Sequence, residues 1–265
     1  MRIEAIAKVF TGIGGHVPAI QSVSLAVEPG EFLAIVGPSG CGKSTLLQII
    51  AGLVQPTDGR VYLGEQDVTG QPAHMVYLFQ QYSKSLLPWM NVADNVMFAF
   101  RHRVSLSRSA ARDRCREYLA MVGLSDFADH YPWQLSGGMQ QRVTIARALA
   151  AEPKVLLMDE PFSSVDALTR IDLQSLILDL WNERRFTAVL VTHDVDEAVF
   201  LADRVAVLSR RPAVLSEVIE TGLPRPRRTI ETRESPAFLS LRHRLLQHLL
   251  ARPEESHAVS RGAHC

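Results

Sequence analysis

Four short, unbroken runs of apolar and β-branched residues constrain the fold of this chain more than any other feature of its sequence. They cover residues 32–36, 155–158, 187–192 and 205–208, and helix-like stretches separate them. Such runs are typical of strands buried on both faces of a parallel sheet. Polar residues follow three of the runs, at the edge where open α/β sheets bind ligands. The pattern predicts an α/β fold with a ligand site at that edge.

The N-terminal part has a different pattern. Residues 2–10 and 22–27 alternate in polarity, and Asp58-Gly59 is a turn signal before residues 60–63. These features predict antiparallel strands, and therefore a mixed sheet with an antiparallel β subdomain. The glycine-rich residues 12–15 would form a loop and do not match a GxGxxG phosphate motif.

The stretch from about residue 92 to 150 carries no strand signal. Three helices are expected there, and each start has a residue type that commonly caps a helix, namely Asn91, Ser107 and Ser136. We predict a helical subdomain at about residues 85–151, inserted into one domain that spans residues 1–220.

The C-terminal part, residues 221–265, is predicted to be a connector with a short amphipathic helix at about residues 241–250 and a polar terminus. Its Pro- and Arg-rich sequence at 223–228 is interpreted most simply as a solvated linker. Contact with anionic lipid is the alternative, although about five basic residues are the minimum for such a patch.

Composition limits the class of protein. The chain has 265 residues, with 28 Lys+Arg against 28 Asp+Glu, so its net charge favours neither nucleic acid nor anionic lipid. Cys41, Cys115 and Cys265 show no CxxC spacing, which argues against a disulfide framework or a zinc site and favours a reducing compartment. We expect no signal peptide, and no apolar stretch approaches the roughly 18 residues needed to cross a bilayer.

The strongest functional motif follows the first apolar run. Residues 37–45 spell GPSGCGKST, which matches G-x-x-x-x-G-K-[ST] between a buried strand and a helix. Backbone N–H groups and the helix N-terminus would cradle phosphates, Lys43 would reach the β- and γ-phosphates, and the Ser44 hydroxyl would ligate Mg²⁺. The predicted nucleotide-binding residues are Gly37, Pro38, Ser39, Gly40, Cys41, Gly42, Lys43, Ser44 and Thr45.

Two carboxylates follow the second apolar run. Asp159 could hold Mg²⁺, usually through water, and Glu160 could polarise an attacking water. A strand that ends in acidic residues is commonplace by itself. Together with the phosphate-binding loop, the two carboxylates become a matched pair.

A second anion cradle is predicted where the third helix begins. Residues 135–142 spell LSGGMQQR, and a serine hydroxyl, free N–H groups and a helix N-terminus favour an anion there. The alternative is a plain helix N-cap. Because the chain already has a complete cradle, a second one suggests that it completes the site of another molecule.

In their order along the chain, GPSGCGKST, Gln80, LSGGMQQR, LLMDEP, SSVD and His193 resemble an ABC-transporter ATP-binding subunit. The resemblance covers residues 1 to about 220, and LSGGxQQR is highly specific to this family. It implies an α/β P-loop ATPase core with an inserted helical subdomain. The chain differs at Met139, where many members have Gln, and in SSVD, which replaces the commoner SALD. Neither difference removes a group that the mechanism needs.

The resemblance implies roles for individual residues. Glu160 would be the general base, Gln80 would touch Mg²⁺ and the attacking water, and His193 would contact the γ-phosphate. Phe10 would stack on adenine, and a Phe packed in the core is the alternative. Because Gln81 follows Gln80, either residue could be the glutamine of the Q-loop. The resemblance also implies that Ser44, Gln80 and Asp159 bind the metal. The signature residues Ser136, Gly137, Gly138 and Gln140 would contact the nucleotide of a second subunit across a dimer. Asp166 would belong to the D-loop, which communicates across that dimer.

Several other members of the superfamily are excluded. The interval between Gln80 and Ser136 is too short for the coiled coil of chromosome-maintenance and repair ATPases, and translation factors need two ATPase units. Exporters carry fused transmembrane helices, and no stretch of this sequence is predicted to be one. The stretch after His193 is expected to be too short for the extra β-domain of sugar-type importers. A stand-alone subunit of a bacterial importer remains.

Three further stretches indicate the importer subfamily. LLPW at residues 86–89, DALTR at 166–170 and LPRPR at 223–227 resemble the nitrate/sulfonate/taurine importer family. An exposed Leu/Trp cluster is a typical interface anchor, so Leu87, Pro88 and Trp89 are predicted to contact a permease, with a packed loop as the alternative.

The resemblance also implies cofactors, partners and location. ATP and Mg²⁺ would be bound, and the partners would be a second copy or paired ATPase subunit, an integral-membrane permease and, indirectly, a periplasmic substrate-binding protein, with no nucleic acid. The protein would be peripheral, at the cytoplasmic face of the inner membrane. An ATPase for another cargo (a pyrimidine precursor, bicarbonate or an aromatic acid) and a nucleotide-binding regulator stay open as alternatives. The cargo is not encoded, because an ATPase subunit never touches it.

Overall fold

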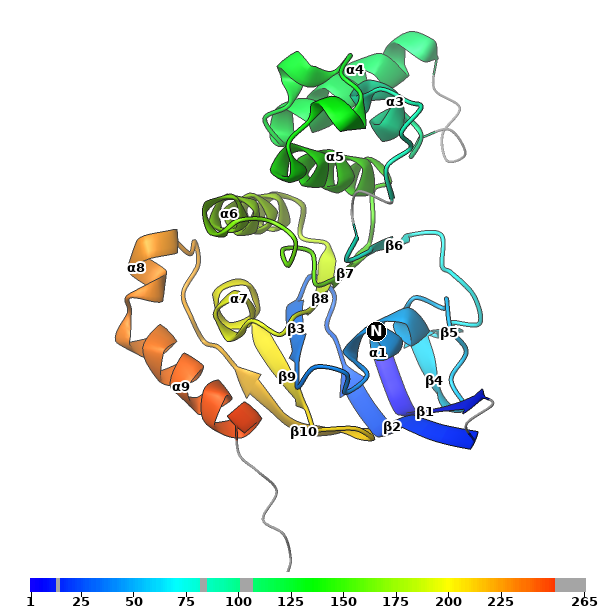
Figure 1. Cartoon of the computed structure of the whole chain (residues 1–265), viewed down its shortest axis with the longest axis vertical. Coiled ribbons are helices and arrows are strands. Elements are labelled where there is room, and N and C mark those ends of the chain that lie inside the picture. Colours follow the sequence, from blue (N-terminus) through cyan, green and yellow to red (C-terminus); the bar gives the residue numbers. More distant parts are fainter. Residues whose placement is uncertain (13–14, 82–84, 101–106, 251–265) are drawn as a thin grey trace, which may run out of the picture.

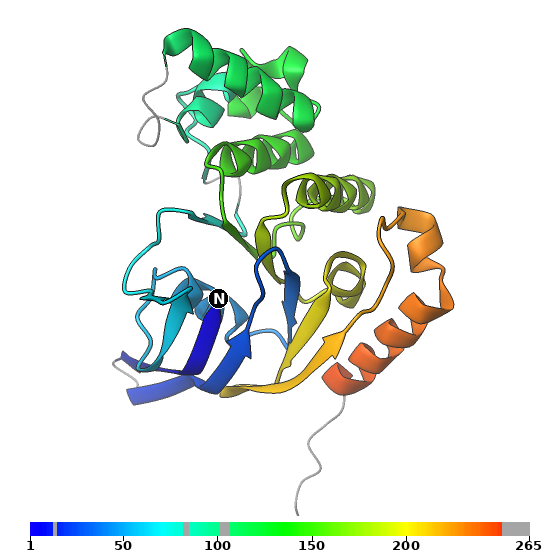
Figure 2. The same ribbon diagram turned by 180° about the vertical axis from the view of Figure 1, so that it is seen from behind.

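One mixed β-sheet organises the part of the chain that the computed structural model describes, residues 1–12, 15–81, 85–100 and 107–250. Its strands pair in the order β5-β4-β1-β2-β10-β9-β3-β8-β7-β6. Figures 1 and 2 show this curved sheet and its helices from two opposite sides. The α/β fold predicted from the apolar runs is therefore confirmed.

The central strands are parallel. They are β3 (Phe32–Val36), β6 (Met75–Leu78), β7 (Val155–Asp159), β8 (Thr187–Val191) and β9 (Arg204–Leu208). Every residue of β3, β7 and β8 is buried. Because these strands run in one direction, the segments that follow β3, β6, β7 and β8 meet at one edge of the sheet.

The N-terminal strands are antiparallel, as predicted. The hairpin of β1 (Arg2–Gly12) and β2 (Gly15–Ala26) is extended on the β1 side by β4 (Asp58–Leu63) and then β5 (Gln66–Asp67). Strand β10 (Ala213–Glu220) joins the two parts, since it pairs parallel with β2 and antiparallel with β9. The centre of the loop predicted at residues 12–15 lies outside the described residues.

Alternate side chains of the buried strands supply two apolar cores on opposite faces of the sheet. From β3, Phe32, Ala34 and Val36 enter one core, and Leu33 and Ile35 enter the other. The first core is covered by α6 (Ala167–Arg184) and α7 (Val195–Leu201), and the second by α1 (Lys43–Ile50). Burial on both faces explains why these strands show no alternation of polarity.

The region without strand signals contains α3 (Val92–Met97), α4 (Arg108–Met121), α5 (Gly137–Ala150) and two short 3₁₀ helices, Ser125–Phe127 and Pro132–Gln134. Asn91, Ser107 and Ser136 cap α3, α4 and α5 as predicted, each by accepting a bond from the N–H three residues further on. These helices lie together at one end of the molecule (Figure 1). The subdomain and domain boundaries stay predictions.

The C-terminal segment differs from its prediction. Helices α8 (Thr229–Arg233) and α9 (Pro236–Leu250) pack against α7, and α9 begins well before residue 241. The prediction that residues 223–228 form a solvated linker is wrong for Arg225 and Arg227. Arg227 is only 7% exposed, and the Arg225 guanidinium carbon lies 4.0 Å from the ring centroid of Trp181.

These arginines are buried because the last turn of a helix leaves carbonyl groups that need donors. The Arg227 guanidinium donates to the carbonyl oxygens of Val199, Phe200 and Ala202 at the end of α7. Arg225 donates to the Leu201 carbonyl and to the Asp203 carboxylate. A planar group with five N–H donors suits such a cluster of acceptors. The segment is an anchored cap on α7, and neither arginine is free to contact lipid.

Within the described ranges, no helix has both the length and the apolar character needed to cross a bilayer. The polar terminus predicted after residue 250, with Cys265, lies outside those ranges.

Candidate functional site

The loop between β3 and α1 has the conformation that its glycines allow. Gly40 and Gly42 have φ angles of 74° and 116°, which residues with a Cβ rarely adopt. At Gly37 an added Cβ would lie 3.0 Å from the Leu208 carbonyl oxygen. Gly42 then caps α1, so the helix begins at Lys43 with its N–H groups facing the loop. This is the geometry of a phosphate-binding loop.

Lys43 lies folded over the same loop. Its ammonium donates to the carbonyl oxygens of Gly37 and Pro38, at 2.8 and 3.1 Å, and the residue is 5% exposed. The positive charge is thus held at the centre of the loop by neutral acceptors. Phosphate oxygens are stronger acceptors for an ammonium than carbonyl groups, because the bond joins two charges.

Asp159, at the end of β7, connects the loop to the neighbouring strands. Its Oδ1 accepts a bond from the Ser44 hydroxyl at 2.8 Å, and its Oδ2 accepts one from the Tyr77 hydroxyl at 2.9 Å. Burial raises the pKa of Asp159, and these two hydrogen bonds oppose that change. Two oxygen-bearing side chains predicted for the metal, Ser44 and Asp159, are therefore in contact.

Tyr77 is a site residue that the sequence motifs do not mark. It lies on β6, opposite Leu157 of β7, and only this strand pairing brings its hydroxyl to Asp159. Burial and the Asp159 carboxylate raise the pKa of Tyr77 well above its usual value, so the hydroxyl stays a donor. No local motif marks such a residue.

The Glu160 carboxylate contacts two side chains that follow neighbouring strands of the sheet. Its Oε2 lies 3.1 Å from His193 Nδ1 and 3.2 Å from Gln80 Nε2. These residues follow β7, β8 and β6, which are adjacent in the sheet. Gln80, rather than Gln81, makes the contact.

Glu160 also has a strained backbone. Its φ of 44° costs a residue with a Cβ roughly 1–3 kcal/mol. Ser163 holds the conformation by donating to the Glu160 carbonyl from both its N–H and its hydroxyl. The strain and its support fix the direction of the carboxylate.

The signature segment combines a helix cap with a close helix contact. Ser136 Oγ accepts a bond from Met139 N at 3.3 Å, and Gln140 Nε2 donates to the carbonyls of Pro132 and Leu135. An added Cβ on Gly138 would lie 2.4 Å from Thr169 Cγ2 of α6. Gly138 therefore has a packing role within this chain, and a role across a dimer stays a prediction.

Asp166 and Phe10 are each accounted for locally. Asp166 caps α6 by accepting a bond from Thr169 N, and the hydrogen bonds from Thr169 lower its pKa. Phe10 is 40% exposed at the end of β1, with Lys8 Nζ 5.2 Å from its ring centroid. The alternative of a core Phe is excluded by this exposure.

The predicted permease contact lies in a loop held by one buried amide. Asn95, on α3, accepts from Leu87 N and donates to the carbonyls of Leu87, Met90 and Asn91. Trp89 is 70% exposed beyond this anchor. Residues 82–84, which lead from Gln80 toward this loop, lie outside the described residues.

A groove of about 330 Å³ adjoins this loop. Side chains from β6, the loop, the residues just after α3, and α5 line it, and they are mostly apolar. Phe79 and Phe98 are both exposed large apolar residues of this lining. An exposed aromatic groove beside a rigid loop is suited to contact with another protein.

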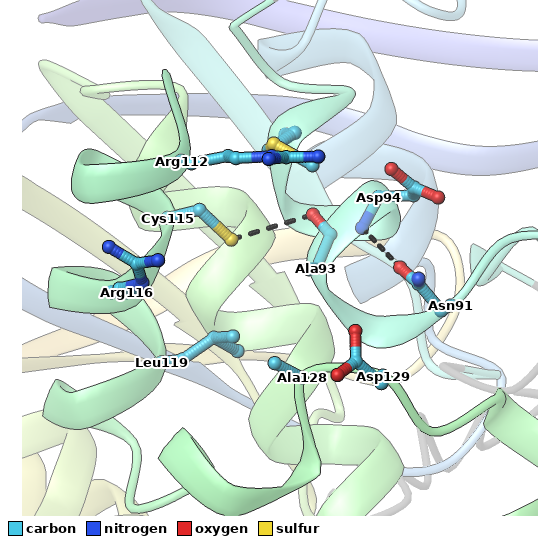
Figure 3. A pocket seen from close by; sticks show the side chains of 10 residues that line it. Asn91, Ala93, Asp94, Arg112, Cys115, Arg116, Leu119, Ala128 and Asp129 are labelled. Atoms are coloured by element: carbon cyan, nitrogen blue, oxygen red, sulfur yellow. Dashed lines mark hydrogen bonds between the residues drawn. The ribbon is translucent and has the colours of Figure 1, made fainter. Parts of the chain in front are cut away.

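A larger cavity, of about 490 Å³, lies among α3, α4 and residues 128–129 (Figure 3). Its charged lining residues are of both signs and exposed: Asp94, Arg112, Arg116 and Asp129. The Cys115 thiol donates to the Ala93 carbonyl, and burial raises its pKa to about 11, so the thiol is neutral. None of the predicted catalytic residues lines this cavity.

The fold and this edge of the sheet are those of a P-loop ATPase. Comparison with known families matches residues 20–163 to the ABC transporter model. The chain belongs to the ABC transporter family, as an ATPase of the ABC type. The predicted ABC family is thereby confirmed, whereas the nitrate/sulfonate/taurine subfamily stays a prediction.

Relatives and solved structures agree with this assignment. The chain is 43% identical to a nitrate import ATP-binding protein of Synechococcus elongatus, over 95% of this chain and 92% of that protein. It is 42% identical to a bicarbonate transport ATP-binding protein of Synechocystis, over 95% of this chain and 89% of that protein. A bacterial ABC transporter cassette solved as a dimer matches with a TM-score of 0.73 and 34% identity, over 83% of this chain and 97% of that one.

Proposed function

We propose that this chain is the ATP-hydrolysing, energy-coupling subunit of a bacterial importer for a small anion. The observation that carries the proposal is the convergence of the phosphate-binding loop, Asp159, Glu160, His193 and Gln80 on one edge of the sheet. Importer relatives at more than 40% identity support the transport role.

The loop residues bind and orient the triphosphate. N–H groups at the start of α1 face the phosphates, and Lys43 exchanges its contacts with Gly37 and Pro38 for charge-assisted bonds to phosphate oxygens. Phe10 offers an exposed ring for the base. These contacts position the γ-phosphate toward Glu160.

The residues present fit Mg²⁺. The Ser44 hydroxyl and the Asp159 carboxylate are hard oxygen donors in direct contact, and Gln80 adds a third oxygen-bearing group at the same edge. When bound, Mg²⁺ would neutralise charge on the phosphate oxygens.

Glu160 is the candidate general base. Its carboxylate is held by the strained backbone and faces both His193 and Gln80, so it can accept a proton from a water placed between them and the γ-phosphate. His193 then orients the phosphate side of the reaction, and Gln80 orients the water.

A second copy of the chain completes the site in this proposal. The Ser136 cap and the free N–H groups of α5 form the second anion cradle, and a two-fold pairing places it on the partner's nucleotide. The solved dimer of a related cassette supports this arrangement.

The chain would work at the cytoplasmic face of the inner membrane, attached to a permease through Leu87, Pro88, Trp89 and the adjoining groove. The cargo is proposed to be nitrate or bicarbonate, because two relatives are named for the transport of these anions. Sulfonate and taurine are the alternatives. A periplasmic binding protein would deliver it.

The mutation Glu160→Gln tests the proposal. Phosphate release should fall by about 10²–10⁴-fold because the base is lost, while ATP binding is retained and the ATP-bound dimer accumulates. The matched control is Glu31→Gln, a buried carboxylate paired with Arg204 before β3, at the opposite end of that strand. Unchanged turnover in Glu160→Gln would remove Glu160 from the mechanism. Ligand binding by the partner periplasmic protein would identify the cargo.

A further inference from the structure

The loop that carries His193 is tied to the protein interior by one buried carboxylate. Glu197, on α7, is 4% exposed, and its Oε2 accepts a bond from Thr192 Oγ1 at 2.6 Å. The same Thr192 oxygen accepts a bond from Asp194 N at 3.0 Å. The residues on both sides of His193 are therefore held through one hydroxyl group.

Arg170, on α6, connects this carboxylate to the D-loop. Its Nε lies 4.0 Å from Glu197 Oε1, and its Nη1 lies 3.6 Å from Asp194 Oδ2. Its Nη2 donates to the carbonyl oxygen of Val165, directly before Asp166, at 3.4 Å. Arg170 Nε is buried and has no hydrogen-bond partner among the described residues. The guanidinium thus spans the two loops, with one donor free to approach Glu197.

The C-terminal segment supports the opposite side of the same carboxylate. The Gln174 side chain, on α6, favours the charged form of Glu197 and so lowers its pKa. Gln174 Oε1 accepts a bond from Arg233 of α8 at 2.5 Å. The Arg233 guanidinium lies 4.4 Å from the ring centroid of Phe200 on α7. Glu197 is therefore enclosed by groups from α6, α8 and the His193 loop.

We propose that Glu197 is a positioning residue for His193, and that Arg170 joins it to the D-loop so that the two loops keep a fixed separation. The inference rests on the proposed function, in which His193 acts at the γ-phosphate. His193 Nδ1 lies 3.1 Å from Glu160 Oε2, so a displacement of its loop changes the catalytic geometry directly. A misplacement of about 1 Å can reduce a rate about 10²-fold.

The charge on Glu197 makes the positioning sensitive to pH. Burial raises the pKa of Glu197 to about 7, and Asp194 adds to this, while Thr192, Arg170 and Gln174 act in the opposite direction. Arg233 is a further charged group that faces it. As the pH falls through about 7, the carboxylate gains a proton and its attraction to Arg170 is lost. Hydrolysis should weaken on the acidic side.

The test compares Glu197→Gln with the control Glu31→Gln. Gln retains the shape and an acceptor for Thr192 but is neutral at every pH. In Glu197→Gln we expect kcat to fall about tenfold while KM for ATP changes less than about twofold, because the geometry of the hydrolytic step is affected more than ATP binding. The ratio of the rate at pH 8 to that at pH 6 should also decrease relative to wild type.

Arg170→Met is the second variant. Arg170 is partly exposed, so the change removes its charge without emptying the core, and we expect the same separation of kcat from KM. Wild-type kcat in both variants, or a lower kcat with an unchanged pH profile, would overturn the proposal. An equal fall in Glu31→Gln would overturn it too. Absence of ATP hydrolysis by the wild-type protein is a different result, because it would refute the proposed function itself.

Discussion

Two buried cations in this protein are both held by backbone carbonyl groups, yet they do different work. Lys43 has two carbonyl partners in a glycine-rich loop, and Arg227 donates to three carbonyls at the end of α7 and to the Thr221 hydroxyl, which follows β10. Burial lowers the pKa of Arg227 to about 10, which leaves it charged at neutral pH. The Lys43 contacts can be replaced by phosphate, whereas those of Arg227 complete a helix. A buried cation is therefore a ligand site only where its acceptors can be exchanged.

The largest effect that would test this comparison is expected from Arg227→Ala. The change removes the donor from the buried carbonyls of Val199 and Phe200, so the free energy of unfolding should fall by about 3 kcal/mol. Urea denaturation measures it. The control is Arg228→Ala, whose side chain is exposed and should change stability by less than about 0.5 kcal/mol. Equal effects in the two variants would mean that Arg227 is not the cap.

Lys43→Ala should show the opposite behaviour. Without nucleotide, its free energy of unfolding should stay within about 1 kcal/mol of wild type, since its carbonyl partners lie at a loop. With ATP at a hundred times the wild-type Kd, the wild type should gain about 2.7 kcal/mol and the variant almost none. Thermal unfolding with and without ATP decides this. If the variant loses stability without nucleotide as Arg227→Ala does, the distinction between the two cations fails.

Trp89→Ala changes an exposed side chain outside both the phosphate-binding loop and the cap on α7, so it separates partner binding from stability and ATP binding. It should leave unfolding and ATP binding unchanged, because the ring is 70% exposed. Permease association should weaken by about 2 kcal/mol, the usual size of an aromatic anchor. A pull-down and an uptake assay in reconstituted vesicles test it. Normal assembly and normal uptake would place the coupling surface elsewhere.

Tyr77→Phe should have the smallest effect. The Tyr77 hydroxyl is buried, as the Arg227 side chain is, and it also bonds to Asp159 in the nucleotide site, so its loss should affect both stability and hydrolysis. Stability should fall by about 1 kcal/mol. Loss of this donor favours protonated Asp159, so its pKa rises further and Mg²⁺-dependent hydrolysis should weaken first as the pH falls. Rates measured against Mg²⁺ at pH 6 and pH 8 test this. An identical Mg²⁺ dependence at both pH values would contradict it.

Local motifs predicted much of the fold and of the candidate site. The buried strands, the antiparallel hairpin and the caps at Asn91, Ser107 and Ser136 follow from residue patterns over a few positions, because propensity and capping are local effects. The C-terminal segment was misread for the same reason. Nothing near Arg225 and Arg227 in sequence shows that α7 ends beside them.

The sequence by itself determined the phosphate-binding loop, the two carboxylates at the end of β7 and the family, since each depends on short-range chemistry that any strand–loop–helix unit would express. The tertiary structure alone decided which side chains meet. Tyr77 reaches Asp159, and Glu160 reaches both Gln80 and His193, only because β6, β7 and β8 are neighbours in one parallel sheet. Contacts between residues far apart in the chain depend on the order of strands, which no local pattern encodes.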